Sequence, residues 1–433
     1  MSGMREIARL MKGLEDQLAG CMRCGTCQAV CPLFAETARE ADVARGKLAL
    51  LDGLRQEMFK DPAGVYKRLN RCLLCGSCAL NCPSGVSVLE IFIKARAILT
   101  GCMDLSMLKK IILRRILSFP ETFARLAAWG VRLQKLFTRP ANQLLGTSCA
   151  RLVAPLPKNR HFKPLAPVPF HQMVPSLNTA PKGSGARAAF FVGCLIDNIF
   201  PNVAKATVKV LNHHGIEVFM PRGQGCCGLP AMAAGDAVAF DRLVRYNLEK
   251  FDGNDIDYLV SACSTCAFTI KKIWPMMFQD DSEEVMAKIE RMAGKTFDIN
   301  QFLVSEVGIK SDLLVSNDDA VVVTYHDPCH LKKSMKVSAE PRALITANPA
   351  YCLKEMPESD WCCGSGGNFN LEYYELSARI GKRKCDNITS SGCSVVATAC
   401  PACMIQISDM LSQSGEAIIV KHPVEIYAEL LKN

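Results

Sequence analysis

Features typical of membrane, secreted and disordered proteins are missing from this sequence of 433 residues. No run approaches about 18 consecutive apolar residues, so we expect no membrane-spanning helix. The amino terminus mixes acidic and basic residues without an apolar core, which argues against a secretory signal. With 49% hydrophobic and 21% charged residues, the chain is neither a disordered protein nor a small disulfide scaffold. We therefore expect a globular, cytoplasmic protein.

Nucleotide-binding signatures are also missing. The glycine-rich run Gly364-x-Gly366-Gly367 follows a pair of cysteines instead of a strand, so it does not satisfy the dinucleotide fingerprint. We find no FAD, NAD or Walker motif, and no aromatic-lined basic module that would bind nucleic acid. Hydride chemistry would therefore need another chain.

Cysteine and local positive charge are what the sequence has in excess. There are 23 cysteines, and thiols in the cytosol stay reduced, so cysteine-rich patterns there more often bind metal than form disulfides. The net charge of +9 comes from one segment, because Lys109 to Arg187 holds 14 basic residues and one acid, Glu121. The rest of the chain is mildly acidic.

Hydrophobic patterning predicts four parts: 1-103, 104-186, 187-312 and 313-433. The first part leans towards helix. The second contains two basic amphipathic helices within Leu108 to Phe137, interrupted at Pro120, and an extended linker with seven prolines in Pro155 to Pro181. The last two parts alternate helices with short strands, which indicates α/β layers with parallel strands. The strand candidates are Ala189 to Gly193, Ile216 to Met220, Tyr258 to Ala262, Val321 to Tyr325 and Ser394 to Thr398.

The third and fourth parts repeat one cysteine pattern. Cys194 corresponds to Cys329, Cys226-Cys227-Gly228 to Cys362-Cys363-Gly364, and Cys263-x-x-Cys266 to Cys400-x-x-Cys403, at offsets of 135, 136 and 137 residues. The fold class we predict is therefore α/β with an α-helical N-terminal domain, followed by two homologous cysteine-rich lobes.

Two cysteine runs in the first part have the spacing of a bacterial ferredoxin. Each run is Cys-x-x-Cys-x-x-Cys-x-x-x-Cys-Pro, in which three thiolates wrap one [4Fe-4S] cubane and the fourth cysteine reaches the other cluster. The spacing assigns Cys21, Cys24, Cys27 and Cys82 to one cluster, and Cys72, Cys75, Cys78 and Cys31 to the second. A zinc ribbon, the alternative, uses two paired ligands per metal instead.

Each lobe also offers five cysteines for one site. Cys194, Cys263, Cys329 and Cys400 follow predicted strands, and ligands in open α/β sheets gather at the carboxyl ends of strands. The Cys-x-x-Cys pairs should lie near helix amino termini, where thiolates are favoured. Five thiolates exceed what zinc or a cubane needs, which points to a larger or unusual cluster.

These motifs resemble the cysteine-rich (CCG) domains of heterodisulfide reductase catalytic subunits. They are also similar to the iron-sulfur subunits of glycolate and lactate dehydrogenases and of anaerobic glycerol-3-phosphate dehydrogenase, and the resemblance covers nearly the whole chain. It implies a noncubane [4Fe-4S] cluster in each complete five-cysteine set. The two sets are Cys194, Cys226, Cys227, Cys263 and Cys266, and Cys329, Cys362, Cys363, Cys400 and Cys403.

The resemblance implies an electron-transfer subunit of a 2-hydroxy-acid (lactate or glycolate) dehydrogenase. An FAD-containing partner would oxidise the substrate, and electrons would pass through this chain towards quinone or a membrane carrier. The alternative is a heterodisulfide reductase-like catalytic subunit that cleaves a disulfide at the noncubane clusters, and a cluster-carrying adaptor is a third reading. The basic helices are either a solvated pair or a docking surface for anionic lipid or a membrane partner, which would place the protein on the inner face of the cytoplasmic membrane.

Seven further residues have less certain roles. We expect the five cysteines outside the clusters to be small buried hydrophobic residues; they are Cys102, Cys149, Cys352, Cys385 and Cys393. His326 and His330 flank Cys329, where either is structural, donates a hydrogen bond to a cluster or moves a proton.

Overall fold

The computed structural model describes residues 2–59, 61–151, 160–179, 185–310 and 319–431. Contacts divide the chain into two units. Unit 1 consists of Met1–Ser118, Gly228–Arg242 and Gly364–Ile380, and unit 2 consists of Phe119–Cys227, Leu243–Cys363 and Gly381–Asn433. The chain therefore passes from unit 2 to unit 1 directly after each Cys-Cys pair. The predicted limit between the two lobes, 312/313, and parts of the proline-rich segment lie outside the described residues.

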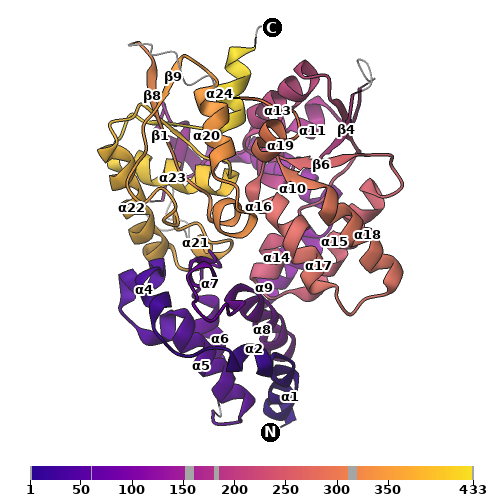
Figure 1. Ribbon diagram of the computed structural model, residues 1–433, viewed down its shortest axis with the longest axis vertical. Coiled ribbons are helices and arrows are strands. Elements are labelled where there is room, and N and C mark those ends of the chain that lie inside the picture. Colours follow the sequence, from indigo (N-terminus) through magenta and orange to yellow (C-terminus); the bar gives the residue numbers. More distant parts are fainter. Residues whose placement is uncertain (1, 60, 152–159, 180–184, 311–318, 432–433) are drawn as a thin grey trace. The chain divides into compact units, whose positions relative to one another are not determined.

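Unit 1 is helical in its described residues, as the first hundred residues predict (Figure 1). Its core contains fully buried apolar residues, among them Leu51, Ile91 and Leu99. The two later segments add short helices and the first turns of α15 and α22. The helices are α1 (Ser2–Met11), η1 (Lys12–Leu14), α2 (Glu15–Ala19), α3 (Thr26–Ala29), α4 (Pro32–Thr37), η2 (Glu40–Asp42), α5 (Ala44–Arg55), α6 (Pro62–Asn70), α7 (Ser77–Leu80), α8 (Val88–Met103), α9 (Met107–Lys110), η3 (Ile111–Leu117), α14 (Leu229–Ala233), α15 (Ala237–Phe251), α21 (Phe369–Glu372) and α22 (Tyr374–Ser390).

The two larger sheets of unit 2 share one order over four strands, as the internal repeat predicts, and the first has β3 as an additional edge strand. In the first sheet the order is β3-β5-β4-β6-β7, and in the second it is β11-β10-β8-β9. All neighbours are parallel except β3, which pairs with β5 in the antiparallel sense. The strands are β3 (Leu177–Asn178), β4 (Arg187–Phe190), β5 (Glu217–Met220), β6 (Tyr258–Ser261), β7 (Thr296–Asp298), β8 (Val321–Tyr325), β9 (Tyr351–Leu353), β10 (Val395–Ala397) and β11 (Ile419–Lys421).

Helices connect these strands and bury the sheets between them (Figure 1). Parallel neighbours require crossover connections, and helices supply them here. The core of the second lobe includes Val323, Tyr325, Val395 and Ile426. The helices of unit 2 are α10 (Pro120–Phe137), α11 (Phe170–Met173), α12 (Cys194–Asn198), α13 (Pro201–His213), α16 (Ser264–Phe268), η4 (Thr269–Ile273), α17 (Trp274–Met277), α18 (Glu283–Lys295), α19 (Ile299–Ser305), η5 (His330–Ser334), α20 (Ala339–Thr346), α23 (Pro401–Ser414) and α24 (Pro423–Leu430).

The basic segment begins with helices on both sides of Pro120, as predicted, because proline is tolerated in the first turn of α10. After α10, strands β1 (Thr138–Asn142) and β2 (Thr147–Ala150) form an antiparallel hairpin that the sequence did not indicate. Residues 160–179 of the proline-rich segment are packed within unit 2, since the His161 backbone N–H donates to Asp409 (2.9 Å). In the described ranges, no helix combines the length and hydropathy that a bilayer crossing requires.

Candidate functional site

One group of four cysteines in unit 1 surrounds a pocket. Cys31 precedes α4, Cys72 and Cys75 lie on the loop before α7, and Cys78 lies in α7 itself. All four line the same cavity together with Pro32 and Lys47. These are the four residues that the ferredoxin-like spacing assigns to one cluster. The fourth cysteine therefore does come from the other run, redirected by the proline that follows it.

The second group in unit 1 is its counterpart. Cys21, Cys24, Cys27 and Cys82 line a separate pocket, which Cys78 of the first group also borders. The two pockets are therefore neighbours. The structure brings together all eight predicted cysteines in the predicted combination of two groups of four.

The backbones of the two cysteine loops have the same unusual conformation. Arg23 (φ 58°) and Gly25 (φ 87°) are left-handed in one loop, and Leu74 (φ 53°) and Gly76 (φ 73°) are left-handed in the other. Alternating conformations of this kind turn successive N–H groups towards one concave side, which suits an anionic group. One such donor, the Leu74 N–H, is 3.5 Å from the Cys72 sulfur.

The donor chemistry of both pockets fits an iron-sulfur cluster. A hydrogen bond with the Thr26 hydroxyl lowers the pKa of Cys24, and Ser77 lies 3.4 Å from Cys75 in the equivalent position. Burial raises the pKa of Cys31 to about 12, so that thiol ionises only when a metal compensates the buried charge. Four converging sulfurs around each cavity, with hydroxyl and N–H donors behind them, are what a cubane requires.

Arg96 of α8 stabilises the loop that carries Cys72. Its guanidinium is buried and donates hydrogen bonds to the carbonyls of Leu69 (2.8 Å) and Cys72 (2.8 Å). It also donates to the carbonyl of Ala233 (2.7 Å) in the segment that follows the first Cys-Cys pair. Sequence reasoning did not single out Arg96, because nothing local distinguishes it from other helical arginines.

The first five-cysteine group lies where the parallel strands of the first lobe end. Cys194 begins α12 after β4, and Cys263 is the N-cap of α16 after β6, as the sequence predicts. The sulfurs of Cys194 and Cys226 are 3.7 Å apart, and Cys266 hydrogen-bonds with Cys227 and Cys263. The structure therefore brings the predicted set together.

Glycine allows this close packing of sulfurs. Gly193 has φ +76°, and a Cβ at this position would lie 3.0 Å from the Cys266 sulfur. A larger residue at this position would therefore have an unfavourable backbone conformation and would also clash with the Cys266 sulfur.

The second five-cysteine group repeats the arrangement. Cys329 precedes η5, and Cys400 is the N-cap of α23 after β10. Cys362 and Cys363 are buried, and the Cys363 sulfur lies 3.3 Å from that of Cys403. A hydrogen bond from Cys263 lowers the pKa of Cys400 well below its usual range.

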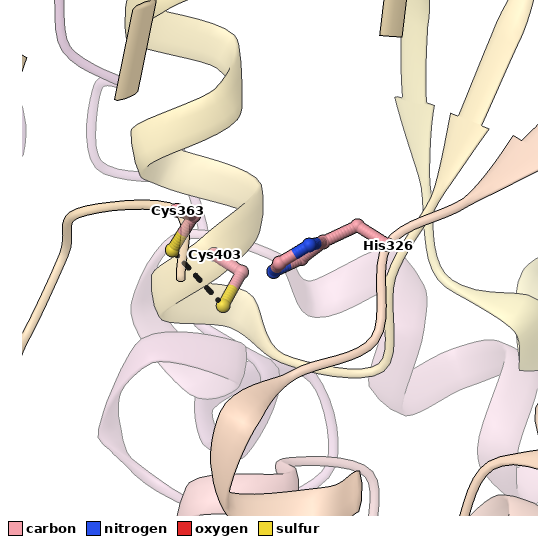
Figure 2. Close-up of side chains that lie close together, drawn as sticks. All are labelled: His326, Cys363 and Cys403. Carbon is pink, nitrogen blue, oxygen red and sulfur yellow. Dashed lines mark hydrogen bonds between the residues drawn. The ribbon is translucent and has the colours of Figure 1, made fainter. Parts of the chain in front are cut away.

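A histidine also faces the second group. The ring of His326 comes from the loop after β8, and one of its nitrogens and the sulfurs of Cys363 and Cys403 lie within 4.8 Å of one another. Figure 2 shows the imidazole pointing towards the two sulfurs. Burial lowers the pKa of His326 to about 3, so the ring is neutral. The sequence did not indicate this position of His326 beside the sulfurs of Cys363 and Cys403.

The two five-cysteine groups adjoin each other. The Cys263 and Cys400 thiols are hydrogen-bonded across the lobes, and the hydroxyl of Thr265 lies 3.4 Å from the Cys400 sulfur. The same hydroxyl is 3.3 Å from Nδ1 of His330, whose ring stacks on Phe268 at 4.5 Å. Neighbouring sulfurs therefore run from the first group into the second.

The five remaining cysteines differ in burial. Cys385 and Cys393 are buried, as predicted, and Cys149 is half-buried. Cys102 and Cys352 are exposed, so the prediction is wrong for these two. Cys102 lies in the last turn of α8, and Cys352 lies on the edge strand β9, where side chains on one face meet solvent.

Comparison with known families agrees with the two kinds of site. The model of the 4Fe-4S dicluster domain matches residues 17–86, and the model of the cysteine-rich domain matches residues 188–271 and 323–408. Both cysteine runs of unit 1 lie within the first match. All ten cysteines of the two five-cysteine groups lie within the other two.

Three curated proteins are among the relatives. The probable glycolate oxidase iron-sulfur subunit of Bacillus subtilis is 29% identical over 418 residues, which cover 93% of this chain and 90% of that protein. Lactate utilization protein A of an Exiguobacterium species is 32% identical over 56% of this chain and 98% of its own length. One subunit of the fumarate reductase (CoM/CoB) of Methanothermobacter marburgensis is 27% identical over 92% of this chain and 69% of its own length. The chain belongs to the family of iron-sulfur proteins with paired cysteine-rich domains that includes lactate utilization protein A and the glycolate oxidase iron-sulfur subunit.

Proposed function

We propose that the protein is the electron-transfer subunit of a 2-hydroxy-acid dehydrogenase acting on lactate or glycolate. An FAD-containing partner subunit oxidises the substrate, and this chain passes the electrons towards quinone or another membrane carrier. The observation that carries the proposal is the set of four cysteine groups, two in the helical unit and two at the carboxyl ends of parallel strands. The relatives named for glycolate oxidase and lactate utilization support the substrate class.

The proposal assigns one cluster to each cysteine group. In unit 1, Cys21, Cys24, Cys27 and Cys82 hold one cubane, and Cys31, Cys72, Cys75 and Cys78 hold the other. Each five-cysteine group holds a noncubane [4Fe-4S] cluster. Bound clusters supply one-electron transfer. The chain supplies the thiolates and orients the N–H groups of the left-handed loops towards them, and in the two lobes it buries most of the sulfurs away from water.

Iron analysis and partner capture test this proposal. The anaerobically purified chain should contain about sixteen iron atoms, and it should co-purify with a flavoprotein that reduces a dye in the presence of lactate or glycolate. About eight iron atoms would show that the two lobes hold no clusters. A cluster-replete protein with no flavoprotein partner would contradict the electron-transfer role.

A second function has a specific observation in its favour. Both five-cysteine sets are complete, and the sulfurs of Cys263 and Cys400 adjoin across the lobes. A heterodisulfide reductase-like catalytic subunit would use such clusters to cleave a disulfide in two one-electron steps, and one relative is a subunit of a fumarate reductase (CoM/CoB). Reduction of a disulfide substrate by the isolated, dithionite-reduced chain would favour this function, whereas activity only with a flavoprotein and a hydroxy acid would exclude it.

The outer face of α10 supports a place at the membrane surface. Five apolar residues there are exposed, including Trp129 at 60%; the others are Leu126, Leu133, Leu136 and Phe137. Arg125, Arg132 and Lys135 are exposed beside them. An amphipathic helix with cationic and aromatic residues binds anionic lipid surfaces. The proposed location is therefore the cytoplasm, peripheral on the inner face of the cytoplasmic membrane.

Vesicle binding tests the membrane contact. The full chain should co-sediment with vesicles of phosphatidylglycerol and phosphatidylcholine and less with phosphatidylcholine alone. Arg132→Glu combined with Trp129→Ala should abolish co-sedimentation, whereas Leu371→Ala, at an exposed apolar residue of α21, should not. Equal binding by the unmodified chain, the double variant and Leu371→Ala would contradict the proposed membrane contact. Arg114, also in the basic segment, makes a poor test, because it pairs with the buried Asp236 at 2.8 Å.

A further inference from the structure

We propose that Nε2 of His326 is an iron ligand of the second five-cysteine group, so that this group holds its cluster with thiolate and imidazole donors while the first group uses thiolates. This inference rests on the proposed presence of a cluster in the second lobe. It adds a donor that the cysteine pattern does not contain.

The hydrogen bond at Nδ1 of His326 determines that Nε2 is the ring nitrogen available to bind iron. Nδ1 of His326 lies 3.1 Å from the carbonyl oxygen of Ser359. A carbonyl only accepts, so Nδ1 carries the proton and Nε2 of the neutral ring carries a lone pair. Metal-ligating histidines commonly donate their other N–H to a backbone carbonyl in this way, which fixes the orientation of the ring.

The second ring nitrogen, Nε2, is buried without a hydrogen bond. His326 is 1% exposed, and among the described residues Nε2 has no hydrogen-bond partner. A buried acceptor without a partner is costly. The ring nevertheless points to the pair of sulfurs from Cys363 and Cys403, with which it forms a group of potential ligand atoms within 4.8 Å (Figure 2). Bound iron would satisfy the lone pair and both thiolates together, and imidazole suits iron.

The first lobe provides an internal comparison. His326 precedes Cys329 by three residues, and the residue that precedes Cys194 by three is Phe191. Phe191 is fully buried, and its ring lies close to the sulfur of Cys266 in the first group. A Cβ on Gly193 would be 3.0 Å from that sulfur and 3.9 Å from the Phe191 ring. Equivalent positions therefore hold an apolar ring in one lobe and a nitrogen donor in the other. The two clusters differ in their ligands, and for that reason they differ in reduction potential.

Pulsed electron paramagnetic resonance tests the ligand directly. The anaerobic, full-length protein is prepared with ¹⁵N-labelled histidine, reduced, and examined for hyperfine coupling between a cluster and a histidine nitrogen. The coupling should be present in the natural protein and in His330→Phe, and absent in His326→Phe, which places the ring of the first lobe in the second. Iron loss to a chelator should be at least about tenfold faster in His326→Phe. His326→Gln provides a second variant if the phenylalanine impairs folding.

The outcomes separate this inference from the proposed function. About twelve iron atoms or fewer, with the deficit in the second lobe, would overturn the proposed cluster there and the ligand with it. Full iron content with no histidine coupling, or with a coupling that persists in His326→Phe, would overturn the ligand alone. Zinc in the second group in place of iron would contradict both.

Discussion

Arg96 donates a hydrogen bond of 2.7 Å to the carbonyl of Ala233, six residues beyond Cys227. The same guanidinium holds the carbonyl of Cys72 at 2.8 Å. One buried cation thus ties a cysteine loop of the ferredoxin-like region to the segment that continues from the first Cys-Cys pair. This arrangement stabilises unit 1 and keeps a positive charge beside the Cys72 loop.

Replacing Arg96 should lower the stability of unit 1 and shift the reduction potential of the cluster beside Cys72. Arg96→Met leaves several buried carbonyls without a donor, so we expect unit 1 to lose about 3 kcal/mol or more of stability. It also removes a positive charge near Cys72, so the reduction potential of the nearby cluster should become more negative. Thermal unfolding and a redox titration measure the two effects. Arg115→Met, at an exposed position of η3, is the control and should change neither.

Iron content should depend on which cysteine is lost. Cys75→Ser, at a buried position in the first group of unit 1, should remove about four of about sixteen iron atoms. Cys102→Ser, at an exposed cysteine outside the four groups, should remove none. The measurement is colorimetric iron analysis with visible absorbance. Equal losses from the two variants would contradict the grouping.

A methyl group at Gly193 should disturb the first five-cysteine group. Gly193→Ala forces a Cβ to within 3.0 Å of the Cys266 sulfur at φ +76°. Gly215→Ala has nearly the same φ, +74°, and no atom of the described chain within 4 Å of the added carbon. Both variants should lose about 1–3 kcal/mol through backbone strain. Iron analysis should show a loss only in Gly193→Ala, and an equal loss in both would mean that the sulfur contact is unimportant.

The buried carboxyl of Asp298 should make stability depend on pH. Burial raises its pKa to about 7, whereas an unfolded aspartate has a pKa of about 3.9. The folded protein therefore keeps a proton that the unfolded chain releases, and stability falls as the pH rises from about 4 to about 7, by an order of 4 kcal/mol. Above the folded pKa the loss is complete.

Asp298→Asn should flatten this dependence, because the amide keeps the oxygen that accepts from the Asn300 N–H and cannot ionise. The apparent melting temperature between pH 5 and pH 8 measures the slope. Asp257→Asn, at an exposed residue of the same unit, should retain the natural slope. A slope that survives in Asp298→Asn would assign the pH dependence to another group.

Local sequence signals predicted much of the fold and which cysteines lie close together. The strand candidates and the helices around Pro120 are confirmed because apolar periodicity and proline act within a few residues. Cys31 lines one pocket with Cys72, and Cys82 lines the other with Cys21, as expected where the spacing of each run limits how its sulfurs can converge.

Other features depend on contacts between distant residues. The interlobe pair Cys263 and Cys400 arises only when two lobes pack, and the contact of Arg96 with Ala233 spans 137 residues. The exposure of Cys102 depends on which face of α8 is covered. No local pattern carries such information. His326 was noticed because it is near Cys329, but its aim towards Cys363 and Cys403 requires the fold.

The run of neighbouring sulfurs from Cys194 to Cys363 has a consequence for maturation of the protein. Before iron arrives, these positions are reduced thiols side by side, and a sulfenic acid formed on one condenses readily with the next. A disulfide between Cys263 and Cys400 would cross-link the lobes and deprive both groups of a ligand. Oxidation of the empty thiols would therefore compete with insertion of the proposed clusters.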